Sequence, residues 1–431
     1  MNYSNNLKKI IKKKNAVIGL IGMGYVGLPL SILISDKGYN LNCFDKNLKR
    51  VKLLKNGKSY FNNIKNKELK SFKKNTQIFT SLKNISNCDI IILCLPTPLK
   101  LNKKPDLSDI KVIIQKIKNK LKKGQLLILE STSYPGTTTE EIYDKLKFDF
   151  DIGKNFFIAF SSERINPGMK MKIQNIPKVI SGHTKKCLEL TRFFYSRLFS
   201  KLILAKSTEI AEFSKLLENI YRSVNIGFIN EMKFIADKFG LDIFEIIALS
   251  NTKPFGFKRF DPGPGIGGHC IPIDPQYLYW KSRSKGLMPK FIKLSAEINL
   301  EVIPFIYKKI IKRMKDVNKI RKNFKIIILG IAYKKNVDDD RESASIKLIE
   351  FLINKNFKKV EYSDPYIPKY RFNKRINKIS NKVNKETLTK FDLVIIGTDH
   401  DKFDFKNIEK NSNYIIDCRG RLKLGKKVIR G

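Results

Sequence analysis

The chain has 431 residues, of which 42% are hydrophobic, and a formal net charge of +45. This length predicts two or three domains, and the hydrophobic content excludes a disordered chain. No apolar run approaches a membrane span, and the basic N-terminus lacks the apolar segment of a secretory signal, so a cytosolic location is expected. The six cysteines are scattered without CxxC spacing and there are three histidines, so neither a disulfide framework nor a metal site is expected.

The excess of positive charge has two interpretations. One is nucleic-acid binding. The other is compositional drift, because lysine is spread over the whole chain beside abundant Asn and Ile, and no element interleaves basic with aromatic residues. The sequence favours drift, although a positive field would attract a polyanionic substrate or cofactor.

Strand and helix patterns alternate over the first 200 residues. A strand is predicted at 16–21, a helix at 26–37 that ends at Gly38, and a strand at 41–44 that ends at Asp45. Further buried strands are predicted at 89–96, 125–131 and 156–162. Strands that alternate with helices indicate an α/β fold with a parallel, doubly wound sheet.

The middle of the chain has a helical pattern instead. One long helix is predicted from 208 to about 239, ending at Gly240, and shorter helices at 242–250 and 290–315 flank a glycine-rich loop. Alternation resumes with strands at 325–333, 391–399 and 413–420. We therefore expect an α/β domain, a helical middle domain and a second α/β domain, over residues 1–205, 206–315 and 316–431.

The segment GMGYVG follows the first strand and opens a helix. In that context Gly22 suits a tight turn, Gly24 the close approach of a pyrophosphate, and Gly27 the packing of helix on strand. Asp45 ends the second strand, where a carboxylate accepts hydrogen bonds from ribose hydroxyls and repels a 2′-phosphate. NAD is therefore favoured over NADP, although the adjacent Lys46 weakens that preference. A glycine turn without a ligand is the alternative.

The stretch FDPGPGIGGHCIPIDP places one thiol among glycines and prolines. Glycines let the backbone approach a ligand without obstruction by side chains. Cys270 is a candidate nucleophile with Asp274 close by in sequence, but a small apolar residue under a loop is an equally good interpretation. We assign the other five cysteines to packing.

Lys215 and Asn219 are four residues apart on the predicted long helix, and Arg222 extends the same face. Taken alone, this row is most simply a solvated helix face.

Nine segments, in this order, resemble the UDP-glucose/GDP-mannose dehydrogenase family. They are GMGYVGLPL, PTPL, ESTSYPGTT, SSERINPG, KLLENIYRSVNIGFINEM, KPFGF, PGPGIGGHCIPIDP, GIAYKKNVDDDRES and TDHDKFD. Within the family the chain is most similar to the bacterial UDP-N-acetylglucosamine 6-dehydrogenases of surface-polysaccharide synthesis. The resemblance implies an N-terminal Rossmann NAD domain, a central domain with a long dimerisation helix, and a C-terminal Rossmann-like domain for the UDP-sugar.

The resemblance also implies a four-electron oxidation of the sugar C6 alcohol to a carboxylate, with two NAD reduced. A water ordered by Asp274 and Lys215 would take the hydroxyl proton. Cys270 would capture the aldehyde as a thiohemiacetal, and Lys215 and Asn219 would stabilise the developing negative charge on oxygen. A water activated by Glu163 or Asp274 would hydrolyse the thioester left by the second oxidation.

Other positions match family residues one at a time. Thr132 matches a threonine near the reacting carbon, Lys334 and Arg419 match residues that hold the diphosphate, and Arg259 matches an arginine that reaches the sugar of the neighbouring subunit. Implied contacts to NAD are made by Gly22, Gly24, Tyr25, Val26, Gly27, Asp45, Thr97 and Thr132. Implied contacts to the UDP-sugar are made by Glu163, Lys215, Asn219, Arg222, Arg259, Gly265, Gly267, Lys334 and Arg419.

Four positions are unusual or open in meaning. Ser162 stands where relatives often have proline, and Pro167 stands where many have a second glutamate, so Glu163 would act without that helper. Asp261 precedes the glycine loop where an aromatic or amide is more usual. Arg341 lies near the cofactor or substrate, or else pairs with an aspartate of 338–340.

The expected substrate is UDP-N-acetylglucosamine, for lipopolysaccharide O-antigen or capsule. UDP-glucose, UDP-N-acetylgalactosamine, UDP-N-acetylmannosamine and GDP-mannose are rivals within the same chemistry. Two alternatives from other classes are a basic nucleic-acid-binding protein on an α/β scaffold and a zinc alcohol dehydrogenase, which lacks its ligand cluster here. The resemblance implies a homodimer, because family members pair through the long helix and Arg259 acts across that contact. The alternative, a monomer, would leave four apolar residues of the helix without cover, namely Leu217, Ile220, Val224 and Phe228.

Overall fold

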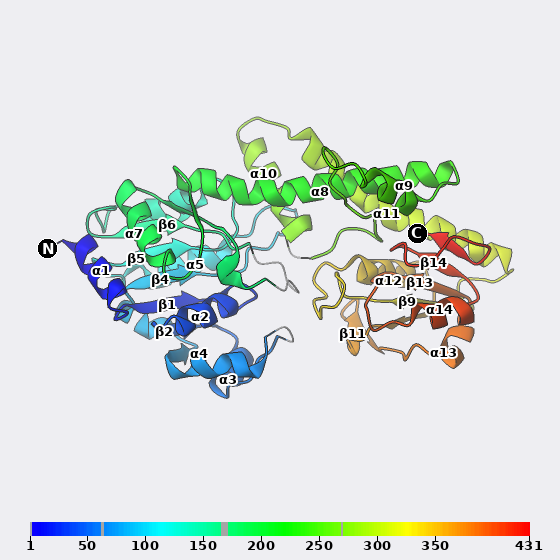
Figure 1. Cartoon of the computed structure of the whole chain (residues 1–431), viewed down its shortest axis with the longest axis horizontal. Helices are drawn as coiled ribbons and strands as arrows, with labels where there is room; N and C mark the ends of the chain where they lie inside the picture. The colour runs from blue at the N-terminus through cyan, green and yellow to red at the C-terminus, as the bar shows by residue number, and fades with distance from the viewer. Residues whose placement is uncertain (1, 62–63, 165–170, 269) are drawn as a thin grey trace. The chain divides into compact units, whose positions relative to one another are not determined.

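The computed structural model describes every residue except 1, 62–63, 165–170 and 269. The chain divides into two compact units, each drawn around its own sheet in Figure 1. The first unit comprises Met1–Glu218 and Gln276–Leu287, and the second comprises Asn219–Pro275 and Met288–Gly431. The α/β class predicted from the sequence is confirmed in both.

The first unit contains an eight-stranded sheet in the order β3-β2-β1-β4-β5-β6-β7-β8. Its strands are β1 (Val17–Ile21), β2 (Asn40–Phe44), β3 (Thr76–Phe79), β4 (Ile90–Leu93), β5 (Leu126–Leu129), β6 (Phe157–Phe160), β7 (Lys178–Gly182) and β8 (Leu202–Leu204). Neighbouring strands are parallel except for the antiparallel pair β6–β7. The chain winds outward from β1 in one direction and then continues at β4 in the other, which makes β1–β4 the topological switch point where α/β sheets bind ligands.

The central strands are continuous apolar runs because helices cover both faces of a parallel sheet. All four residues of β4 and of β5 are buried. The helices of this unit up to residue 207 are α1 (Tyr3–Lys12), α2 (Gly27–Asp36), α3 (Leu48–Lys55), α4 (Leu69–Lys74), α5 (Ser108–Lys118), α6 (Asp144–Leu146) and α7 (Lys185–Tyr195). Residues of α1, α2 and α7 share one core with alternate residues of β1, β4, β5 and β6.

The helical middle contains α8 (Thr208–Lys238), α9 (Ile243–Ser250), α10 (Cys270–Ser284) and α11 (Lys290–Asp316). Helix α8 is followed by Gly240, whose φ of +69° no L-residue adopts easily. The predicted loop around Cys270 is partly wrong, because α10 begins at that residue despite Pro272 and Pro275. A proline in the first turn costs no helical hydrogen bond, so Pro272 is compatible with a helix start.

The second unit contains a five-stranded parallel sheet in the order β10-β9-β13-β14-β15. Its strands are β9 (Lys325–Leu329), β10 (Lys359–Ser363), β13 (Leu393–Ile396), β14 (Ile415–Asp417) and β15 (Val428–Arg430), with α12 (Ala344–Asn354), α13 (Lys385–Thr389), α14 (Phe405–Asn411) and the antiparallel pair β11 (Lys369–Phe372) and β12 (Ile376–Ile379). Strand β9 is shorter than predicted, because Gly330 turns the chain with φ +81° and has no room for a Cβ, which would lie 2.2 Å from Thr398 O.

Among the helices of the described chain, none is both long and apolar enough to cross a bilayer.

Candidate active site

Five of the predicted residues follow five neighbouring strands of the first sheet. Gly22 follows β1, Asp45 follows β2, and Thr97, Thr132 and Glu163 come shortly after β4, β5 and β6. These strands are parallel, so their carboxyl ends lie along one edge of the sheet. This edge is where open α/β sheets bind ligands.

The glycine turn has the shape that a pyrophosphate needs. Gly22 adopts φ +96°, and a Cβ on it would lie 2.4 Å from Cys94 O. A Cβ on Gly27 would lie 1.9 Å from Gly22 O, so helix α2 packs directly on the turn. At Gly24, by contrast, an added Cβ meets no atom within 4 Å. The three glycines therefore leave a cradle open at the N-terminal end of α2, which favours an anion.

Asp45 is fixed and nearly buried beside this cradle, with 8% of its surface exposed. Its carboxylate accepts hydrogen bonds from Met23 N at 2.9 Å and Asn47 N at 2.8 Å, and Arg50 Nη1 lies 3.6 Å away. Tyr25, in the turn, packs against Phe61, with ring centroids 4.2 Å apart and the ring planes tilted by 36°. Val26 is the N-cap of α2. The turn and the carboxylate fit a dinucleotide with a free ribose diol.

Glu163 belongs to a buried cluster of charges that the sequence did not predict. Lys178 Nζ lies 2.9 Å from Glu130 Oε2 and 3.5 Å from Glu163 Oε2, and Tyr195 donates a hydrogen bond to Glu130. Burial raises the pKa of Glu130 to about 7, although Lys178 opposes that rise. Burial alone would lower the pKa of Lys178, but the two carboxylates raise it, so the lysine stays charged. Arg164 N donates to Glu163 Oε1 at 2.6 Å.

The loop that carries Thr132 is tied to α8 by a buried carboxylate. Glu212 accepts hydrogen bonds from Gly136 N at 2.6 Å, and from Thr138 N and Oγ1 at 2.8 and 2.7 Å. Burial raises the pKa of Glu212 to about 7. Lys215 lies one turn further along α8 and is partly exposed. Thr97 is buried, and Thr132 is partly exposed.

In the second unit, Cys270 and Asp274 lie on the first turns of α10. The Cys270 thiol is exposed, whereas the other five cysteines are buried. Asn219 Nδ2 on α8 donates a hydrogen bond to Asp274 Oδ2 at 2.6 Å, and both side chains are buried. The beginning of a helix favours negative charge, as a thiolate requires.

The glycine loop before Cys270 is shaped by contacts within the protein. A Cβ on Gly267 would lie 2.9 Å from Tyr333 Cβ, and one on Gly268 would lie 2.9 Å from the ring of the same tyrosine. A Cβ on Gly263 would lie 2.8 Å from Arg419 Nη1. Gly265 has φ +136°. Close packing within the protein therefore requires these glycines, in addition to the ligand approach for which the sequence pattern suggested them.

A buried lysine holds the same loop. Lys233, on α8, donates a hydrogen bond to Gly263 O at 3.0 Å, and its side chain is 2% exposed. Burial lowers the pKa of Lys233 to about 8.

Two cations lie within electrostatic reach of each other on the same unit. Lys334 follows β9, and Arg222 is on the exposed face of α8. Burial and, secondarily, the positive charge of Arg222 lower the pKa of Lys334. Arg419 follows β14, and its Nε donates to Gly397 O at 2.7 Å. Lys334 and Arg419 both follow strands of the same parallel sheet, at its carboxyl edge, where positive charge is suited to an anionic ligand.

Five further positions are placed by an ion pair or by burial, or lie outside the described residues. Arg341 donates hydrogen bonds to the carboxylate of Asp339 at 2.6 and 2.9 Å. This is the salt bridge with an aspartate of 338–340 that was one of the two alternatives. Arg259 Nε lies 2.9 Å from Asp261 Oδ1 on the surface. Ser162 is buried, whereas Pro167 lies outside the described residues.

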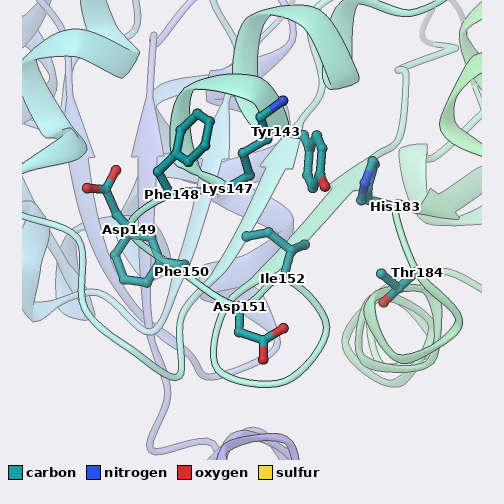
Figure 2. Close-up of a pocket in the computed structure, with 9 residues that line it drawn as sticks. All are labelled: Tyr143, Lys147, Phe148, Asp149, Phe150, Asp151, Ile152, His183 and Thr184. Carbon is teal, nitrogen blue, oxygen red and sulfur yellow. The ribbon is translucent and has the colours of Figure 1, made fainter.

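A pocket of about 450 Å³ in the first unit contains none of the predicted residues. It is lined by Tyr143, residues 147–152, His183 and Thr184 (Figure 2). The rings of Tyr143 and His183 stack with centroids 4.0 Å apart and fill one side of it.

Family models match the chain in three consecutive regions. They describe the NAD binding, central and UDP binding domains of the UDP-glucose/GDP-mannose dehydrogenase family, and they match residues 16–199, 209–301 and 327–424. The chain belongs to this family. As a member it is an NAD-dependent UDP-sugar 6-dehydrogenase, and the glycine turn and Asp45 fit the cofactor.

Individual relatives are similar over nearly their whole length. The chain is 34% identical to a UDP-N-acetyl-D-mannosamine dehydrogenase of Methanocaldococcus jannaschii, over 92% of this chain and 89% of the relative. It is 31% identical to a UDP-N-acetyl-D-glucosamine 6-dehydrogenase of Salmonella typhi, over 93% and 95%. A solved UDP-D-ManNAc dehydrogenase of Pyrococcus horikoshii is 28% identical, with a TM-score of 0.84 over 95% of this chain and 96% of that one.

Proposed function

We propose that the chain oxidises C6 of UDP-N-acetylglucosamine to a carboxylate through a covalent intermediate on Cys270. The observation that carries this proposal is the exposed thiol at the start of α10, one turn before Asp274, whose carboxylate is held by Asn219. NAD bound at the glycine turn would accept the hydride of the first oxidation, and a second NAD bound there in its place would accept the hydride of the second.

The chain's own residues move protons and hold charge. In the first oxidation, a water ordered by Asp274 and Lys215 takes the proton of the C6 hydroxyl as the hydride leaves C6. The Cys270 thiolate then adds to the aldehyde carbon and forms a C–S bond. Lys215 and Asn219 stabilise the oxygen that gains the electron pair. Loss of the second hydride converts this thiohemiacetal into a thioester.

Hydrolysis completes the reaction and restores the enzyme. A water loses its proton to Glu163 or Asp274 as its oxygen bonds to the carbonyl carbon. The C–S bond breaks, the electron pair returns to Cys270 as a thiolate, and the product leaves as the uronic acid. The aldehyde is not released, because the C–S bond to Cys270 holds it as the thiohemiacetal until the second oxidation.

The diphosphate is assigned to Lys334, Arg419 and Arg222. The support is their placement: Lys334 and Arg419 follow β9 and β14 at the carboxyl edge of one sheet. Burial and, to a smaller degree, the positive charge of Arg222 lower the pKa of Lys334, and a bound anion would oppose that shift. Arg259, now paired with Asp261, would reach the sugar of a neighbouring subunit, as the family resemblance implies.

UDP-N-acetylmannosamine is the second candidate substrate. The names of the relatives favour it, because the solved relative from Pyrococcus horikoshii and the one from Methanocaldococcus jannaschii are mannosamine enzymes, whereas the Salmonella relative is a glucosamine enzyme. Both sugars have a 2-acetamido group and differ only in configuration at C2.

A panel of sugar nucleotides with NAD tests the proposal. UDP-N-acetylglucosamine, its manno and galacto isomers, UDP-glucose and GDP-mannose are each supplied in limiting amount, and the NADH formed at completion is counted. Two NADH per UDP-N-acetylglucosamine are expected. One NADH with free aldehyde would refute the thioester route, and turnover of the manno isomer alone would reassign the substrate.

A homodimer through α8 is also proposed. Leu217 and Phe228 are 55% and 51% exposed, as unpaired interface residues would be, whereas Ile220 is buried within the chain at 8%. Sedimentation equilibrium should give twice the chain mass of 49.9 kDa, and replacing both exposed residues by glutamate should give the monomer. A cytosolic location and a role in O-antigen or capsule synthesis remain predictions.

A further inference from the structure

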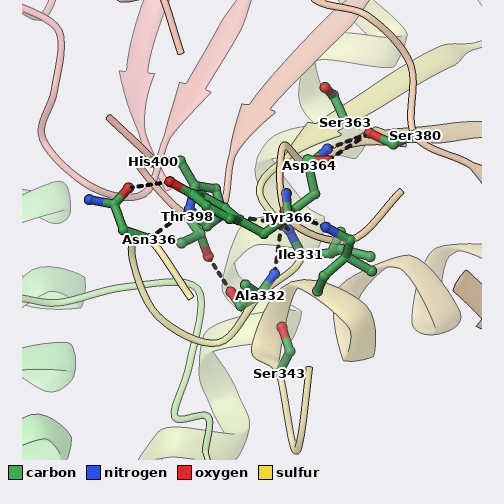
Figure 3. Close-up of polar contacts among 12 residues, drawn as sticks. Ile331, Ala332, Asn336, Ser343, Ser363, Asp364, Tyr366, Ser380, Thr398 and His400 are labelled. Atoms are coloured by element: carbon green, nitrogen blue, oxygen red, sulfur yellow. Dashed lines mark hydrogen bonds and ion pairs between the residues drawn. The ribbon is translucent and has the colours of Figure 1, made fainter. Parts of the chain in front are cut away.

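A buried aspartate–histidine pair spans the carboxyl end of β9. Asp364 follows β10, and His400 comes shortly after β13, so they belong to the two neighbours of β9 in the sheet. His400 Nε2 lies 3.1 Å from Asp364 Oδ2, and neither side chain is exposed. The pair therefore lies across the point where the chain leaves β9 for the loop that carries Lys334 (Figure 3).

The hydrogen bonds assign the proton of the histidine. Asn336 N donates to His400 Nδ1 at 2.9 Å, so Nδ1 must offer its lone pair. Nε2 then carries the hydrogen and donates it to Asp364. Burial alone would raise the pKa of Asp364, but its hydrogen bonds, from His400 and from backbone N–H groups, lower it below its ordinary value.

The pair holds both ends of a short stretch of backbone. Asp364 Oδ2 accepts from Ile331 N at 2.7 Å and from Ala332 N at 2.9 Å. His400 holds Asn336 at the other end, where φ is +60°. Between these anchors lie Tyr333, which packs on the glycine loop, and Lys334, near Arg222.

We infer that His400 is a positioning residue for the UDP diphosphate, because it fixes the backbone on which Lys334 approaches the anion. The inference rests on the proposed function, in which Lys334 binds that diphosphate. A buried pair with a purely structural role would stabilise the domain without a specific effect on UDP affinity. In the positioning role, UDP affinity depends on the hydrogen bond from Asn336 N to Nδ1 and not on the hydrogen bond from Nε2 to Asp364. In a purely structural role, it depends on neither bond specifically.

Two substitutions separate the two bonds of the ring. His400→Asn keeps an acceptor near the position of Nδ1 and loses the contact to Asp364. His400→Gln keeps a donor near the position of Nε2 and loses the acceptor for Asn336 N. His183→Gln, in the first unit, is the matched control, because its ring stacks on Tyr143 far along the chain from this loop.

The test measures binding of UDP alone by calorimetry, together with the unfolding temperature and the KM and kcat for the UDP-sugar. We expect His400→Gln to bind UDP about tenfold more weakly and to raise KM with kcat changed by less than about threefold. His400→Asn and His183→Gln should bind within about threefold of the unmodified chain, even where His400→Asn unfolds at as low a temperature as His400→Gln.

The outcomes distinguish the inference from the proposed function. Normal UDP affinity in His400→Gln overturns the inference and leaves the proposed function intact. The inference is also overturned if His400→Asn and His400→Gln lose the same UDP affinity and that loss follows the fall in their unfolding temperatures. A purely structural role would produce that result. An unmodified chain that does not bind UDP overturns both.

Discussion

Replacing Gly24 by alanine should weaken NAD binding without destabilising the fold. A Cβ at Gly24 meets no atom within 4 Å, and its φ is not among the positive values of the chain, so alanine fits the backbone. A glycine-to-alanine change at such a position stabilises the fold by about 0.4–1 kcal/mol, because the unfolded chain loses freedom. The added methyl group would, however, occupy the space that the pyrophosphate needs. We expect NAD affinity to fall about tenfold or more, which corresponds to about 1.4 kcal/mol or more of binding free energy.

Gly27→Ala is the matched control for this prediction. Its Cβ would lie 1.9 Å from Gly22 O, which forces helix α2 away from the turn at a cost of about 1–3 kcal/mol or more. Calorimetry with NAD and thermal unfolding of both variants provide the assay. The reasoning would be refuted if Gly24→Ala bound NAD as well as the unmodified chain, or unfolded at as low a temperature as Gly27→Ala.

Three further predictions concern single side chains. Cys270→Ser should bind UDP normally and form almost no uronic acid; acid formed at the normal rate would exclude the thiol as nucleophile. Lys233 has a folded pKa of about 8 against 10.5, so its ammonium form opposes folding. The free energy of unfolding of the unmodified chain should therefore rise by about 3 kcal/mol relative to that of Lys233→Met between pH 8 and pH 10.5 (about 2.5 units at 1.36 kcal/mol each). The result would be contradicted if the difference between the denaturant midpoints of the two proteins were the same at both pH values. Lys178→Met should lower the free energy of unfolding by about 3–5 kcal/mol, because it leaves a buried carboxylate without its cation. Adding Glu130→Gln should recover part of that loss, and equal unfolding temperatures for the single and double variants would count against the buried pair.

The fold and the place of the cofactor could be predicted from local patterns. The alternation of strands and helices gave the parallel sheets, and the glycine turn followed directly from its position between β1 and α2. Asp45 was predicted at the end of β2 for the same reason, because the ends of parallel strands share one edge. The order of motifs also indicated the family, which the matches to all three of its regions confirm.

The buried charges could not be predicted, because they depend on contacts between distant residues. Glu130 directly follows β5, whereas Lys178 is the first residue of β7, so the two residues are far apart in the sequence. A lysine at the start of an apolar run is usually exposed to solvent at the end of a strand. Lys233 sits in a helical pattern where a lysine normally faces water, yet it is buried against Gly263. A signal was present for one pair: Asp364 and His400 each follow a buried strand, as functional side chains of α/β sheets do.

Trapping of the acyl-enzyme tests the central claim most directly. The enzyme is mixed with UDP-N-acetylglucosamine and excess NAD for a single turnover and quenched with hydroxylamine, which converts a thioester to a hydroxamate. The account predicts a sugar hydroxamate from the unmodified chain and none from Cys270→Ser. Formation of uronic acid by the unmodified chain with no hydroxamate at any quench time would contradict it.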